Sequence, residues 1–184
     1  MRRAGRPGVA CLLFAAAACG APEKPDAGST ASPGTAAASR SLVPHARLSA
    51  EIPELAGWTR EPSTGASIAL PAPASHTSAT FVRGNARIDF EITDTGGAAA
   101  HVEALAKVAG TSFLQKAANG YVKGTVVDGF PALESWNSVD RLGDLTVLIN
   151  GRFTVHATGT GLDSIEILQS AIARTNLKKI AELK

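Results

Sequence analysis

The residues that could carry chemistry in this 184-residue chain are few and widely spaced. The four histidines are His45, His76, His101 and His156. No two of them stand three or four positions apart, and no His-Glu-x-x-His motif occurs, so the local spacing of a zinc site is missing. His156 is expected on the solvent-facing side of a strand with Thr154 and Thr158, where a surface histidine and a catalytic one are both open interpretations.

Asp89 and Glu91 are predicted to share one face of a strand, about 7 Å apart along it. Such a carboxylate pair could serve a glycosidase or bind a cation. Arg87 beside them, and Arg83 across the predicted hairpin, favour the alternative of a solvated ladder of ion pairs. If the chain were a small hydrolase, Asp89, Glu91 and His156 would be its working residues.

Two further patterns could bind a ligand but also have a purely structural explanation. Gly159-Thr160-Gly161 begins like a dinucleotide-binding turn, but Ser164 stands in the third small position and the preceding strand belongs to a hairpin, which favours a flexible loop. Trp58 and Trp136 could stack on a sugar or peptide, yet aromatic residues make up only 5% of the chain, and we predict both in the core. The sequence contains no Gly-x-Ser-x-Gly elbow or phosphate loop.

Three hairpins are predicted to position these residues. Each has two apolar-rich runs around a dipeptide that accepts the positive φ of a tight turn. They pair 79–83 with 86–93 around Gly84-Asn85, 121–127 with 130–136 around Asp128-Gly129, and 145–149 with 152–157 around Asn150-Gly151. Strict alternation over 86–93 indicates a strand with one buried face.

Helical spacing appears twice. Apolar residues recur every three or four positions over 98–118, and Asn119-Gly120 supplies a left-handed stop. Asp163-Ser-Ile-Glu166 resembles a capping box that opens a second helix, followed by a last turn or helix over 177–183. We therefore predict the α+β class: an antiparallel sheet built from hairpins with two helices packed on it, after an N-terminal signal and a flexible linker.

The first 46 residues differ in composition from the rest. Arg2, Arg3 and Arg6 precede an apolar run over 9–18, which is too short for the ~20 residues of a membrane-spanning helix and is typical of a secretory signal. Residues 19–46 are rich in Ala, Pro, Gly and Ser and predict a disordered linker. The domains are thus a signal peptide at 1–18, a linker at 19–46 and a single α+β domain at 47–184.

The signal ends on Ala16-Ala17-Ala18-Cys19, which resembles the lipobox of bacterial lipoproteins. The resemblance implies that Cys19 receives a diacylglycerol, becomes the first residue and is then acylated. Gly20 in the second position, in place of aspartate, favours the outer membrane. Ala16-x-Ala18 also fits an ordinary cleavage site, so soluble secretion is the alternative.

Removal of the signal would leave a nearly neutral domain without thiols. Cys11 lies inside the signal and Cys19 would carry lipid, which excludes a disulfide, a zinc–thiolate site or a cysteine nucleophile in the mature domain. Loss of Arg2, Arg3 and Arg6 takes the formal charge from +2 to −1, which disfavours nucleic acid as a partner.

These features predict a non-catalytic envelope lipoprotein, held to the membrane by its lipid, whose domain binds a partner or assists an assembly. No cofactor and no metal are predicted. The alternatives are a small periplasmic hydrolase and a carrier of a hydrophobic ligand between sheet and helices. The element order over 48–184 is similar to the PsbP-like α+β sandwich, a topological resemblance that implies no site residues.

Overall fold

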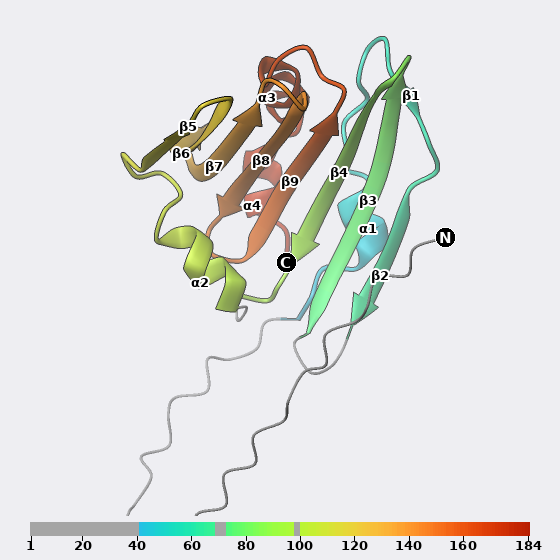
Figure 1. The fold of residues 1–184 in the computed structure, drawn as a ribbon. Coiled ribbons are helices and arrows are strands. Elements are labelled where there is room, and N and C mark those ends of the chain that lie inside the picture. The colour runs from blue at the N-terminus through green and yellow to red at the C-terminus, as the bar shows by residue number, and fades with distance from the viewer. Residues whose placement is uncertain (1–40, 69–72, 98–99) are drawn as a thin grey trace, which may run out of the picture. The chain divides into compact units, whose positions relative to one another are not determined.

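One antiparallel sheet organises the computed structural model, which describes residues 41–68, 73–97 and 100–184 (Figure 1). Its order is β1-β3-β4-β9-β8-β7-β6-β5, and β2 pairs with β3 alongside β1. The strands within these ranges are β1 (Thr59–Arg60), β2 (Thr64–Ile68), β3 (Ala74–Arg83), β4 (Ala86–Asp94), β5 (Leu114–Ala117), β6 (Gly120–Val127), β7 (Phe130–Asn137), β8 (Leu142–Ile149) and β9 (Phe153–Thr160).

All three predicted hairpins are confirmed. The closing pairs are Arg83 with Ala86, Val127 with Phe130, and Ile149 with Phe153. Asn150 has a φ of 51° and Gly151 one of 63°, as the dipeptide signal predicts. Arg152, expected in the following strand, is instead the last loop residue, and its side chain pairs with Asp94.

The long helix predicted over 98–118 is wrong. The structure has α2 (Ala100–Ala106), then turns, then β5. Gly110 adopts a φ of 70°, which ends helical geometry there, and residues 114–117 pair with β6 in the register Lys116 to Tyr121. Asn119 lies in the turn of this fourth hairpin and does not cap a helix.

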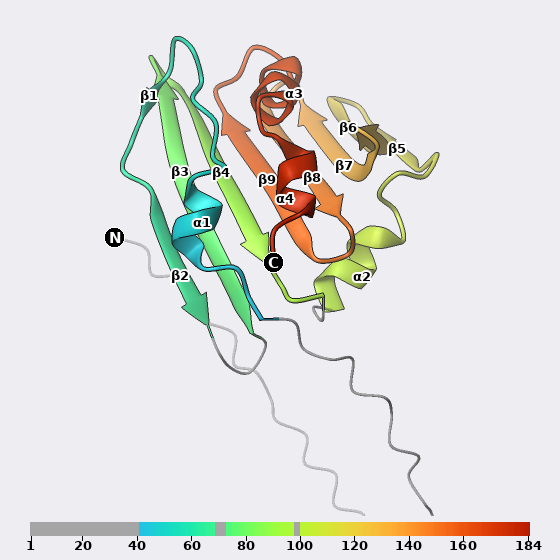
Figure 2. The same cartoon turned by 180° about the vertical axis from the view of Figure 1, so that it is seen from behind.

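Three short helices cover one face of the sheet: α1 (His45–Ser49), α3 (Glu166–Ala173) and α4 (Leu177–Ala181) (Figure 2). The core lies between them and the sheet. Its largest fully buried side chains include Phe81, Phe90 and Phe153 from the strands and Leu168 and Ile172 from α3. The α+β prediction is therefore confirmed in its coarse form, an antiparallel sheet with a few short helices.

The predicted capping box does not form. Ile165 is the N-cap of α3, and no side chain caps the helix. The carboxylate of Asp163 instead pairs with Arg141, in the segment between β7 and β8, and Arg141 Nε donates to the carbonyl of Leu162 at 2.9 Å. The contact anchors the chain where it leaves β9 for α3.

The opposite face, here called the open face, carries the polar side chains of the central strands. The α2 crossover covers its lower end, where Leu148 and Thr154 are buried. A Cβ on Gly124 would lie 2.5 Å from the carbonyl oxygen of Val108, so the crossover backbone packs directly on β6. The upper part of this face has no helix over it in the described residues (Figure 1).

Candidate functional site

The structure places Asp89, Glu91 and His156 on the open face, as predicted. In the register between β4 and β9, Glu91 lies opposite His156 and Asp89 lies opposite Thr158. Alternation brings these side chains to one side because Ile88, Phe90 and Ile92 fill the core on the other.

Asp89 belongs to a surface network, which confirms the ion-pair alternative for Arg87. Arg87 Nη2 lies 2.7 Å from Asp89 Oδ1, and the hydroxyl of Thr80 donates to the same oxygen at 2.7 Å. The hydrogen bond from Arg87 lowers the pKa of Asp89. The predicted partner Arg83 is wrong, since it pairs in register with Ala86 and points to the helix-covered side.

His156 has a partner that the sequence did not reveal, Asp144 of β8. His156 Nε2 lies 2.6 Å from Asp144 Oδ2 and 3.1 Å from the hydroxyl of Thr158. The hydrogen bond with Asp144 raises the pKa of His156 and partial burial opposes this, while the negative charges of Asp144 and Glu91 add to the rise. The predicted strand began at Leu145, one residue too late to include the carboxylate.

This cluster differs from a catalytic triad in its geometry. A triad uses one ring nitrogen for the carboxylate and the other for the hydroxyl nucleophile. Here the contacts to Asp144 and to the Thr158 hydroxyl are both made by Nε2 of His156. The carboxylate therefore occupies the nitrogen that would have to accept the hydroxyl proton.

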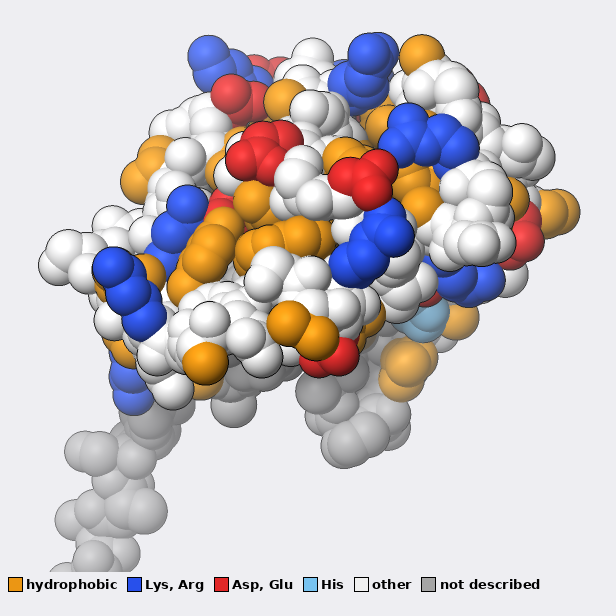
Figure 3. Space-filling model, turned by 45° about the horizontal axis from the view of Figure 1, so that its top comes forward, with side chains coloured by type: hydrophobic (Ala, Val, Ile, Leu, Met, Phe, Trp, Pro, Cys, Tyr) orange, Lys and Arg blue, Asp and Glu red, His pale blue; other side chains and the backbone are white. Residues whose placement is uncertain are grey.

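Beside the cluster lies a groove of about 620 Å³, here called the distal groove. Its lining combines small apolar side chains, amides and hydroxyls. Asp144 is the one lining residue that is either charged or a histidine. Figure 3, which brings the top of the molecule forward, shows hydrophobic side chains gathered in a hollow with charged side chains around it. The open-face residues that line the groove are Gln115, Ala117, Val122, Ser135, Asn137, Leu142, Asp144 and Thr158.

The comparisons with known proteins give no family. No protein-family model, curated protein or solved structure matches this chain. Within residues 41–68, 73–97 and 100–184, no group of three His, Cys, Asp or Glu side chains is arranged to hold a metal ion.

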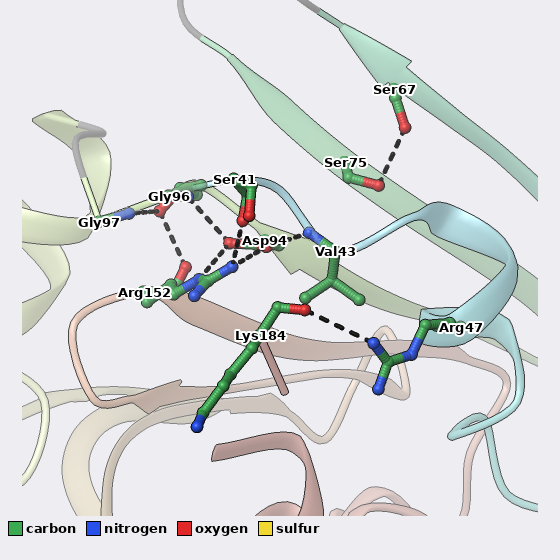
Figure 4. Close-up of polar contacts among 11 residues, drawn as sticks. Ser41, Val43, Arg47, Ser67, Ser75, Asp94, Gly96, Gly97, Arg152 and Lys184 are labelled. Carbon is green, nitrogen blue, oxygen red and sulfur yellow. Dashed lines mark hydrogen bonds and ion pairs between the residues drawn. The ribbon is translucent and has the colours of Figure 1, made fainter. Parts of the chain in front are cut away.

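At the opposite end of the sheet, a buried ion pair holds the start of the domain (Figure 4). Arg152 Nε donates to Asp94 Oδ1 at 2.8 Å and Nη2 to Oδ2 at 2.7 Å. Asp94 also accepts from the backbone N–H of Val43 at 2.8 Å, and Arg152 Nη2 donates to the carbonyl of Ser41 at 2.9 Å. Val43 is fully buried, so the packed domain begins before the predicted boundary at 47.

The balance at Asp94 explains why this pair tolerates burial. Loss of water opposes its ionisation, but hydrogen bonds from Arg152, Val43 and Gly96 outweigh that cost and lower its pKa. The side chains of Asp94 and Arg152 are 0% and 7% exposed. Such a pair fixes residues 41–43 to the loop after β8.

The distal groove and Ser41 therefore lie at opposite ends of β8. The strand runs from Leu142, in the groove, to Ile149, beside the loop that holds Ser41. Seven steps at about 3.4 Å per residue separate these ends by about 24 Å.

The remaining predicted residues have structural places. Trp58 and Trp136 are half-buried and pack against the core cluster, so their predicted core position holds only in part, and each also lines a hollow. His45 lies in α1 and His76 in β3, while the side chain of His101 and all of Cys19 lie outside the described part. No helix in the described residues is long and apolar enough to cross a membrane.

Proposed function

We propose that the chain is a lipid-anchored envelope protein whose domain binds a partner in the distal groove. The groove carries this proposal because it combines an apolar lining with a few fixed polar groups, the usual make-up of a binding site. Anchorage rests on the lipobox resemblance at Cys19. The position of Ser41 at the other end of the sheet supports a groove that faces away from the membrane.

Binding is preferred over hydrolysis because the polar groups of the open face are already engaged with one another. Asp89 is held by Arg87 and Thr80, and Asp144 occupies His156 Nε2. A hydrolase would need one of these groups released to activate water or a hydroxyl. A ligand in the groove needs only the side chains as they stand.

Site-specific photocrosslinking in intact cells tests the proposal. A benzoylphenylalanine at Leu142, 43% exposed in the groove, is expected to give a discrete adduct after irradiation. The matched control is the same residue at Ile68, which is 47% exposed near the other end of the sheet. Adducts of equal yield at both positions would contradict a specific groove ligand.

A second variant ties the adduct to the groove. Val122→Arg places a long charged side chain among the lining residues and should abolish the Leu142 adduct without unfolding the sheet, since Val122 is only half-buried. The far-ultraviolet circular dichroism spectrum checks the fold. An unchanged adduct in a folded Val122→Arg protein would exclude the groove as the binding site.

A further inference from the structure

A second hollow, of about 290 Å³, lies on the helix-covered side of the sheet. Its walls come from the segment after α1, the end of β3 and α3, which Figure 2 shows on the same face. Leu55, Ile88 and Ala171 give it an apolar floor, and all three are buried. We call it the arginine hollow after the two cations that line it, Arg83 and Arg174.

Arg83 is held in place by an aromatic ring. The centre of its guanidinium lies 4.4 Å from the centroid of the Trp58 ring. A cation–π contact of this kind needs no hydrogen bond and leaves the N–H groups of the guanidinium available. In the described part of the chain, no carboxylate forms an ion pair with Arg83, because the acidic residues predicted to pair with it lie on the open face.

Arg174, at the C-terminal end of α3, also forms no ion pair within the described ranges. Four other arginines, Arg60, Arg87, Arg141 and Arg152, each pair with a carboxylate. The hollow thus gathers two guanidinium groups that the described residues do not neutralise.

Glu166 is the one acidic residue in the lining. Interaction with Ser164 lowers the pKa of Glu166, so its carboxylate is a negative charge at the wall of the hollow. Two positive charges therefore face one negative charge around an apolar floor. The hydroxyl of Ser170 adds a neutral donor to the wall.

We propose that the arginine hollow binds an organic anion, with a carboxylate or phosphate head on a short apolar body. Arginine forks match the paired oxygens of both head groups, and the floor removes the apolar body from water. At about 290 Å³, the hollow is near the lower end of the volumes of ligand pockets and suits a small ligand. The site is separate from the distal groove and does not depend on it.

Tryptophan fluorescence gives a direct readout. In the Trp136→Phe protein, Trp58 is the one remaining tryptophan. Titration with hexanoate should change its emission to saturation, whereas hexylammonium, of equal length and opposite charge, should not. Butyl phosphate in parallel separates the two head groups, and a response to either one supports the proposal.

Three arginine variants locate the effect. Arg83→Gln and Arg174→Gln should each weaken the binding of hexanoate about fivefold, the scale of one partly exposed charge contact. Arg174→Gln is the more decisive, because Arg174 does not stack on Trp58 and cannot alter its emission directly. The matched control is Arg87→Gln, which removes a surface arginine of the open face, outside the hollow, and should leave binding unchanged.

Three results would overturn the inference. An equal response to hexylammonium would indicate apolar binding alone, and an equal affinity for inorganic phosphate would indicate an adventitious ion only. An unchanged affinity for hexanoate in the folded Arg174→Gln protein would show that Arg174 does not contribute to the site. If Trp136→Phe fails to fold, the indole N–H resonance of Trp58 in the unmutated protein replaces the fluorescence. None of these results affects crosslinking at Leu142.

Discussion

Asp144 sets the properties of His156, and the effect can be measured at that residue. The two side chains are 2.6 Å apart and 41% and 38% exposed, so the contact is only partly screened. Because the hydrogen bond with Asp144 raises the pKa of His156, an NMR titration of the ring should give a value above the ordinary 6.5. Asp144→Asn should bring the pKa down, while Asp89→Asn, on the same face but bound to Arg87, should not.

The sign of the effect on stability follows from the raised pKa. Protonated His156 is favoured in the folded state, so its contribution is complete below the unfolded pKa and disappears as the pH rises through the folded one. Relative to His156→Gln, the free energy of unfolding should therefore fall from pH 6 to pH 8, by less than about 1 kcal/mol for this exposed pair. Urea titrations at both pH values test this, and a rise over the same interval would contradict the assignment of Asp144 as the partner.

Among the elements, the first residues of the domain depend on a single buried ion pair. Asp94→Asn leaves Arg152 without its counter-charge and is expected to cost about 3–5 kcal/mol in the free energy of unfolding, as breaking a buried pair commonly does. Exchange of the Val43 amide should also accelerate, because that N–H donates to Asp94. The control is Asp89→Asn, whose exposed pair with Arg87 is expected to contribute less than about 1 kcal/mol. Equal stability of the two variants would show that the pair does not hold this end of the sheet.

The hairpins were predictable because their signals are local. Dipeptides such as Asn150-Gly151 fix a turn by their own φ preference, and the alternation around Phe90 marks a buried face. The structure of residues 98–118 was not predictable in this way. The same apolar spacing is compatible with a short crossover that ends at Gly110 and with a following strand that pairs with β6. The contact of Asp144 with His156 depends on the register between β8 and β9, and that of Asp94 with Arg152 joins residues 58 positions apart. No local pattern contains either contact.

At the scale of the whole molecule, the start of the described domain and the distal groove lie at opposite ends of one strand. Residues 41–43 are fixed at one end of β8, and the distal groove opens at the other. The groove therefore lies about the length of β8 away from the residues at which the described domain begins.

Lipidation of Cys19 is the part of the proposed function that concerns the anchor, and it is testable by itself. The two or three acyl chains that the lipobox resemblance implies each contribute about 0.8 kcal/mol per buried CH₂, so the wild-type protein should sediment with membranes and incorporate an alkyne palmitate label. Cys19→Ser should lose both properties. Cys11→Ser, which changes the other cysteine within the predicted signal, should retain them and serves as the matched control. A Cys19→Ser protein that still sediments with membranes would show that another part of the chain holds it there. An unlabelled wild-type protein in the soluble fraction would instead favour cleavage at Ala16-x-Ala18 and secretion.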